Sequence, residues 1–301
     1  MARGPWAPAP RLQRERDLDQ SLESLRAWIG RTETVTEVVS PTPFAALAAT
    51  LDWPAERPAA GTPLPPLWHW IYCVPLHTRS ELGADGHARR GGFVPPVPLP
   101  RRMWAGGQLS FAAPLRVGDA VRRVSRIDDV VEKKGQHGTL IFVRVRHQFE
   151  RGGEPALTEF QDIVYREERR ASDPPPNPRR APAEAAWRRE WTADDVLLFR
   201  YSALTFNAHR IHYDRRYVTA HEGYPGLVVH GPLTATLLLD LLRRQLPAAQ
   251  VASFDFRALH PLFDGRPFQV CGQPLPDGRS FHLWAQDHDG WLAMDATAVV
   301  R

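Results

Sequence analysis

The residues of this 301-residue chain with the clearest capacity for chemistry gather between positions 201 and 214, in the segment YSALTFNAHRIHYD. An apolar helical run breaks there into a polar turn that carries Asn207, His209, Arg210 and His212. A short way on, GLVVHGP ends in a Gly-Pro step, which is typical of a helix start. Imidazoles near a helix N-terminus predict acid–base chemistry on a carbonyl compound, because the free N–H groups there favour a developing negative charge.

The elements that must position this turn belong to the second half of the chain. Residues 191–205 predict a helix capped by Thr192, and residues 231–246 predict an almost wholly apolar helix, shorter than a membrane span and buried on most sides. Alternating segments between 251 and 300 predict strands joined by Asp-Gly turns. A sheet wrapped around the apolar helix would account for this order.

The first half repeats the plan with one difference. It predicts a strand over 32–39, a helix over 41–51 and an antiparallel meander from 108 to about 166. Where the second half has its apolar helix, the first has a Pro- and Gly-rich stretch, 79–107, which predicts a long loop. Residues 109–121 also align with 254–268, which indicates internal duplication with one central helix shortened or lost.

This order predicts four parts of the chain. Residues 1–30 form a helical extension, 31–170 a degenerate first unit, 171–190 a Pro-rich linker and 191–301 the catalytic unit.

The charge, the cysteine count and the hydropathy of the chain exclude several classes of partner and location. The net charge of +4 is modest and the arginines are scattered among acids, so nucleic acid is not an expected partner. Cys73 and Cys271 are too few and too far apart for a disulfide framework or a CxxC metal site, which favours a reducing compartment. No apolar run approaches the ~18 residues needed to cross a membrane, and no segment resembles a signal peptide. We therefore expect a cytoplasmic protein with no membrane partner.

The whole pattern resembles the double hot-dog fold, an α+β class in which antiparallel sheets wrap around a central helix. The central motif is similar to that of the MaoC-like hydratases and dehydratases: an Asp, a His five residues later, and a downstream (I/V)-V-H-G run. These positions fall on Asn207, His212 and Gly231. LPPLWHWIYCVP, RGGFVPPVPLPRRMWAGG and WIGRTETVTEVVSPTP extend the resemblance over nearly the whole chain, toward the hydroxyacyl-thioester dehydratase type 2 group and the mesaconyl-C4-CoA and itaconyl-CoA hydratases.

This resemblance implies a hydro-lyase that adds water reversibly to an α,β-unsaturated acyl-CoA, such as mesaconyl-C4-CoA or itaconyl-CoA, to give citramalyl-CoA. No metal or redox cofactor is implied, and coenzyme A is part of the substrate. His212 is the expected base, because a reference pKa near ~6.5 lets it accept and return a proton. The Gly231 N–H is the expected oxyanion donor. Asn207 replaces the family's Asp, and since an amide is no base at neutral pH, we expect it to orient water.

Substrate binding is assigned to basic and aromatic residues. A dicarboxylic acyl group needs a cation for its free carboxylate, for which Arg210 is the first candidate and Arg257 the second. The CoA phosphates could be met by Arg89, Arg90, Arg101 and Arg102, which are otherwise expected to be solvated surface charges. The full expected set is Arg210, Arg257, His230, Arg101, Arg102 and Trp104.

Two other functions stay open. A dehydratase of 3-hydroxyacyl chains on CoA or acyl carrier protein would share the catalytic residues but need a deep apolar tunnel. A non-catalytic thioester-binding hot dog would tolerate loss of His212. Zinc at His209 and His212 is not expected, because no third ligand with metal-site spacing accompanies them. A homodimer is compatible with each of these functions.

Overall fold

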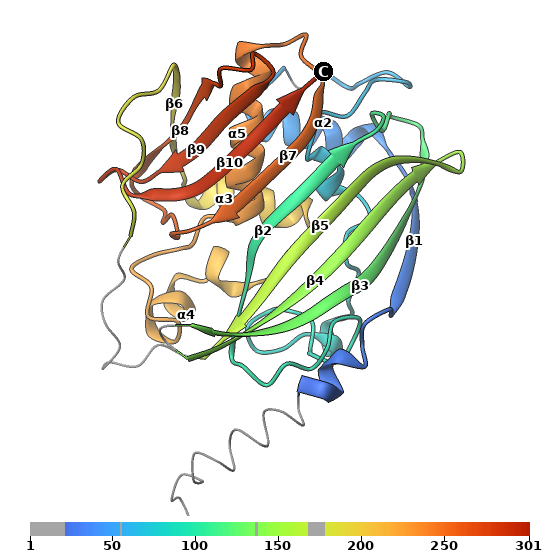
Figure 1. Cartoon of the computed structure of the whole chain (residues 1–301), viewed down its shortest axis with the longest axis vertical. Coiled ribbons are helices and arrows are strands. Elements are labelled where there is room, and N and C mark those ends of the chain that lie inside the picture. Colours follow the sequence, from blue (N-terminus) through green and yellow to red (C-terminus); the bar gives the residue numbers. More distant parts are fainter. Residues whose placement is uncertain (1–21, 55, 136–137, 168–177) are drawn as a thin grey trace, which may run out of the picture.

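A computed structural model describes residues 22–54, 56–135, 138–167 and 178–301, and these build one antiparallel sheet of ten strands (Figure 1). The first half contributes β1 (Thr32–Val38), β2 (Arg101–Phe111), β3 (Ala120–Gly135), β4 (Gly138–Arg151) and β5 (Glu154–Arg166). The second half contributes β6 (Trp187–Thr192), β7 (Val251–Ala258), β8 (Pro267–Pro274), β9 (Ser280–Gln286) and β10 (Leu292–Val300). Together with a few helices, this sheet confirms the predicted α+β class.

The strand order has the symmetry expected of a duplicated chain. It runs β1-β3-β4-β5-β2-β7-β10-β9-β8-β6, so the two halves meet at the β2/β7 pair and each continues outward through four more strands in the same relative order. The aligned segments 109–121 and 254–268 occupy the ends of β2 and β7 and the turns that follow them. Each half therefore contributes its equivalent strand to the central seam.

The seam also corrects one sequence-based boundary. Residues 101–107 were expected to belong to the long loop, but they form the first part of β2. Gly106 and Gly107 lie opposite Arg257 and Phe256 of β7, and a side chain at Gly106 would collide with the Phe256 carbonyl oxygen. These glycines allow a close approach of two strands, a use of glycine that composition alone does not distinguish from a loop.

The helices are α2 (Pro41–Thr50), α3 (Asp195–Leu204), α4 (Arg215–Ala220) and α5 (Gly231–Gln245), with 3-10 turns η1 (Trp68–Ile71), η2 (Arg79–Glu81) and η3 (Arg210–His212). Every residue of α5 from Leu233 to Leu242 is buried, as its apolar sequence predicts. Figure 1 shows α5 lying against one face of the second half's strands, and it packs on β6, β8, β9 and β10.

The first half has no counterpart of α5 among its described residues, which confirms the predicted loss of one central helix. The apolar segment after α2 forms η1 instead, and its Trp68 and Ile71 are buried in the main core. His69 and the Trp70 indole both hydrogen-bond to the carboxylate of Glu159, at 3.0 Å each, so this buried acid is satisfied. Aromatic side chains thus occupy space that a helix fills in the other half.

Two further boundaries differ from expectation. Strand β6 begins at Trp187, inside the segment expected to be a linker, because the alternating WRREWT follows the Pro-rich run and pairs with β8. Helix α3 is capped by Asp194, whose carboxylate accepts a hydrogen bond from the Leu197 N–H at 2.7 Å, and not by Thr192, which ends β6. In the N-terminal extension, residues 22–26 are helical and 1–21 lie outside the described residues. Within the described part, no helix is long and apolar enough to span a membrane.

Asp240 joins the two halves and should be the most sensitive polar residue for stability. It is 4% exposed on α5 and accepts hydrogen bonds from the Trp53 indole and from Arg189 and Arg244, at 3.2 and 2.7 Å for the two arginines. We expect Asp240→Ala to lower the free energy of unfolding by about 3 kcal/mol, the low end of the range for breaking a buried ion pair, because the arginines are partly exposed.

Urea unfolding would measure this change in the free energy of unfolding. Glu190→Ala, an exposed carboxylate on β6, is the control and should change the value by less than about 0.5 kcal/mol. Equal losses in the two variants would contradict the assignment.

Candidate active site

The polar turn after α3 is shaped by its own side chains. The Asn207 side-chain oxygen accepts a hydrogen bond from the His209 N–H at 3.0 Å, and η3 follows directly. Asp214 then caps α4 by accepting from the Tyr217 N–H at 2.9 Å. Asp214 is therefore a cap residue, and the turn holds His209 and His212 on one short segment.

His212 has the geometry of a general base. It is 7% exposed, and its Nδ1 lies 2.7 Å from the Val228 carbonyl oxygen, which can only accept a hydrogen bond. Nδ1 therefore carries the proton and Nε2 keeps a free lone pair. Burial lowers the pKa of His212 to about 4, so the ring is neutral at physiological pH.

His230 supports the His212 ring from the other side. The two imidazoles stack with centroids 3.7 Å apart and planes 18° apart, and His230 Nε2 lies 2.8 Å from the Ser202 hydroxyl. The Nδ1 of His230 is buried and has no hydrogen-bond partner among the described residues. Burial holds the pKa of His230 well below its usual range, so this ring is neutral as well.

The start of α5 lies beside these rings. His230 is its N-cap residue but offers no side-chain cap, and Pro232 lacks an N–H. A Cβ built on Gly231 would meet no atom within 4 Å, so the space before the helix is open. An uncapped helix start next to open space and a neutral imidazole can stabilise negative charge that develops on a carbonyl oxygen.

The arginines expected to bind substrate differ in whether their side chains already have partners. Arg210 donates to the Asp214 carboxylate at 3.0 and 2.7 Å and to the Ala84 carbonyl at 2.9 Å, so most of its donors are engaged in holding loops. Arg101 forms an ion pair with Glu222. Arg102 has no hydrogen bond or ion pair with any described side chain, yet its charge acts on both His87 and His209.

Trp104 and Arg257 have surroundings of their own. The Trp104 indole donates to the Gly106 carbonyl at 2.7 Å and packs edge to face on Trp70. Arg257 alternates with the buried Phe256 on β7, so it points to the face of the sheet opposite α5. There it lines a groove of about 580 Å³ together with Asp255, Asp295 and the ion-paired Arg144 and Asp162.

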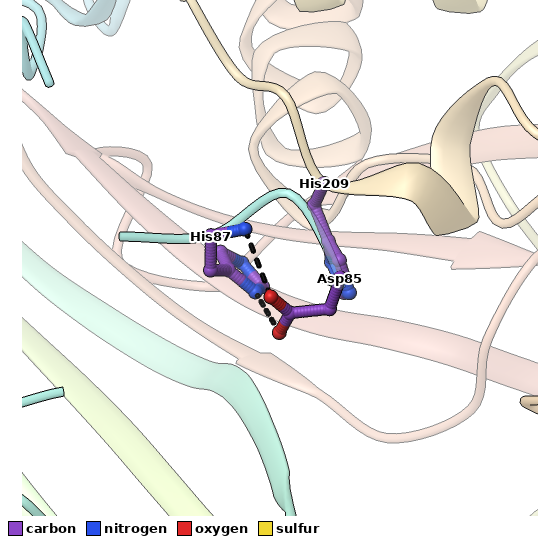
Figure 2. Close-up of side chains that lie close together, drawn as sticks. All are labelled: Asp85, His87 and His209. Carbon is purple, nitrogen blue, oxygen red and sulfur yellow. Dashed lines mark hydrogen bonds and ion pairs between the residues drawn. The ribbon is translucent and has the colours of Figure 1, made fainter. Parts of the chain in front are cut away.

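Two residues that sequence reasoning missed, Asp85 and His87, come from the first half. Figure 2 shows the Asp85 carboxylate turned toward the backbone N–H and the ring of His87, with His209 alongside. Both oxygens lie 3.1 Å from their nitrogen partners, and the His87 ring contacts the His209 ring with centroids 3.8 Å apart and planes tilted by 35°. Burial and neighbouring positive charge lower the pKa of His209 to about 2. No spacing in the sequence indicates this contact, because about 120 residues separate the two segments.

Comparisons with known proteins identify the family of the chain. Residues 67–264 match the family described as Hydroxyacyl-thioester dehydratase type 2. The chain is 48% identical over 272 residues to Mesaconyl-C(4)-CoA hydratase of Chloroflexus aurantiacus, covering 90% of this chain and 96% of that protein.

Solved structures confirm the fold. HtdX of Mycobacterium tuberculosis superposes with a TM-score of 0.63 at 17% identity, over 89% of this chain and 99% of that one. A second protein of the same organism, described as having a double hot-dog fold, gives a TM-score of 0.52 at 15% identity, over 93% and 98% of the two chains. The expected double hot-dog architecture is therefore confirmed.

Proposed function

The chain belongs to the hydroxyacyl-thioester dehydratase type 2 family, and on that premise we propose that it adds water reversibly across the double bond of an α,β-unsaturated acyl-CoA thioester. The observation that carries this proposal is the neutral His212, which is fixed by the Val228 carbonyl with Nε2 unprotonated and whose ring stacks on His230, the N-cap residue of α5. The proposed chemistry uses acid–base residues alone, with coenzyme A as part of the substrate.

The steps of hydration follow from this arrangement. His212 Nε2 takes a proton from water as the water oxygen bonds to the β-carbon, and the π electrons shift toward the thioester oxygen. The N–H of Gly231 donates to that oxygen, an interaction whose loss typically costs about 10²–10³-fold in rate. Return of a proton to the α-carbon completes the addition, and the same path in reverse is dehydration. Asn207 helps to hold the turn in this geometry through its bond to His209.

For the substrate we propose a short dicarboxylic acyl-CoA. The relative that is 48% identical is named for the hydration of mesaconyl-C4-CoA. Mesaconyl-C4-CoA, which is hydrated to citramalyl-CoA, fits both this addition and a site in which the charge of Arg102 acts on the imidazoles. Itaconyl-CoA leads to the same product and is the second candidate substrate, although its double bond is not conjugated with the thioester. Arg102 is better suited than Arg210 to bind the free carboxylate, because the Arg210 donors are used by Asp214 and Ala84. Arg101 and His230 are proposed to line the substrate's path.

The substrate proposal predicts a specificity change at Arg102. We expect Arg102→Gln to raise KM for mesaconyl-C4-CoA about 10- to 100-fold, the value of a charge-assisted hydrogen bond, while KM for crotonyl-CoA changes less than about threefold. Steady-state kinetics on both esters would measure this. Arg200→Gln, an exposed arginine on α3, is the matched control. A parallel rise for both esters would assign Arg102 to the CoA portion instead.

The function itself is tested by incubating the protein with mesaconyl-C4-CoA, itaconyl-CoA, crotonyl-CoA and a long-chain 3-hydroxyacyl thioester and following mass. Gain of one water by a dicarboxylic ester supports the proposal. Loss of water from the long chain alone would replace it with a fatty-acid-type dehydratase. No mass change with any ester, in protein that still binds CoA esters, would indicate a binding protein.

A further inference from the structure

A carboxylate from the first half lies at the site where the second half lacks one. Asn207 cannot act as a base, and its oxygen is already used by the His209 N–H. The loop that contains Asp85 docks directly on the turn, because the Asp85 carbonyl accepts from the Arg210 N–H at 2.9 Å and the Ala84 carbonyl accepts from the Arg210 guanidinium. The degenerate half thus delivers its own polar side chains to the catalytic half.

Asp85 fixes the His87 ring in a defined tautomer. One carboxylate oxygen accepts from the His87 backbone N–H and the other faces the ring Nδ1, each at 3.1 Å. A carboxylate partner places the proton on Nδ1 and leaves Nε2 to exchange protons elsewhere, as in other carboxylate-oriented histidines. The His87 ring contacts the His209 ring at a tilt of 35°, and His209 meets His212 edge to face with centroids 5.5 Å apart.

We propose that His87, oriented by Asp85, is the second acid–base residue of the hydration site and supplies the proton transfer that Asn207 cannot. This inference depends on the proposed function. In hydration, His212 takes the proton from water while the O–C bond forms, and the α-carbon of the resulting enolate takes a proton from the His87 imidazolium. His212 is then protonated and His87 neutral, so one proton passing from His212 to His87 resets the site with no net change.

The charges around the two rings favour this division of roles. Burial lowers the pKa of both, but the Asp85 carboxylate raises that of His87, whereas His212 is hydrogen-bonded to a neutral carbonyl. The charges of Arg102 on β2 and Arg90 on the loop act in the opposite direction on His87. His209 and His230 are held neutral by burial, and Asp85 itself has its pKa lowered to about 2, so it is ionised. The Asp85 carboxylate thus partly offsets the effect of burial on the pKa of His87, and no carboxylate of the described residues does so for His212, which suits an acid paired with a base.

Asp85, His87 and His209 also lie close enough to be considered as a metal site. A hydrogen bond inside the cluster disfavours it. The His87 Nδ1 and one Asp85 oxygen already face each other at 3.1 Å, so an ion bound between them would break that hydrogen bond. Acid–base chemistry therefore fits the cluster better, and metal dependence becomes an outcome of the test.

The test compares pH profiles of mesaconyl-C4-CoA hydration for wild type, His87→Gln and Asp85→Asn. In the wild type we expect a bell shape with its optimum on the acid side of neutrality. Activity is lost at low pH as His212 protonates, and at high pH as His87, whose pKa lies below its usual ~6.5, loses its proton. His87→Gln should lower kcat about 10²–10⁴-fold and remove the alkaline limb. Asp85→Asn removes the negative charge that favours the imidazolium, so the alkaline limb should move to lower pH. His77→Gln, an exposed histidine of the preceding loop, is the control and should keep the wild-type profile.

The outcomes separate the inference from the function on which it depends. If the wild type is active and the His87→Gln variant keeps an unchanged alkaline limb, the inference is overturned and the hydratase proposal stands. This holds even if misfolding lowers kcat of the variant, because the position of the limb does not depend on the amount of folded protein. Wild type that is inactive on all four thioesters overturns both. Activity that a chelator abolishes and a divalent ion restores, with restoration lost in Asp85→Asn, replaces the dyad with a metal site.

Discussion

His212→Gln is expected to lower kcat for hydration about 10²–10⁴-fold while the Kd for a CoA ester changes little. Glutamine can still donate to the Val228 carbonyl and has similar length, so the turn should keep its shape while the proton-accepting nitrogen is lost. Stopped-flow hydration and calorimetric binding of a saturated acyl-CoA would measure the two quantities. His221→Gln, an exposed histidine beyond α4, is the control and should change kcat less than about twofold.

The pKa of His212 also predicts the direction in which activity changes with pH. Because burial places the pKa of His212 at about 4, the active neutral form is present above that pH and is lost as pH falls through it. The acidic limb of kcat/KM in the wild type should therefore lie well below the ~6.5 of an ordinary histidine. An acidic limb near 6.5, or a His212→Gln variant with wild-type kcat, would remove His212 from the role of base.

The sequence predicted most strongly what depends on local pattern. Alternation and Asp-Gly turns located the strands of the second half, and the apolar run identified α5 because ten consecutive buried residues leave no other interpretation. The motif residues His212 and Gly231 also come from neighbouring parts of the structure, because the His212 ring stacks on His230, while their catalytic roles stay predictions.

The sequence could not predict the features of the site that depend on contacts between distant segments. Asp85 and His87 read as ordinary loop residues until the loop is seen docked on residues 208–210. Arg210 was assigned to the substrate because of its place in the motif, but Asp214 lies four residues later, a spacing typical of an ion pair on a helical turn. The i,i+4 spacing of Arg210 and Asp214 is visible in the sequence and favours an ion pair over a substrate-binding role for Arg210.

The docking of this loop leads to the second large effect we expect. Gly86 has φ of +86°, and a Cβ there would collide with the Ala208 carbonyl oxygen. Gly86→Ala must therefore push the loop away from the turn, separating Asp85 and His87 from His209. A misplacement near 1 Å can cost about 10²-fold, so we expect kcat to fall by that order.

Gly91→Ala separates this collision from backbone strain. Gly91 belongs to the same loop and has nearly the same φ, +87°, but a Cβ there would only touch the Pro96 side chain at an ordinary 3.8 Å. Both variants should lose about 1 kcal/mol or more of folding stability from the left-handed backbone, measurable by urea unfolding. Only Gly86→Ala should also lose activity, because only there does the new side chain meet the catalytic turn. If both variants keep wild-type kcat, the contact between the first-half loop and the turn has no part in catalysis, and the acid–base role of His87 loses its structural basis.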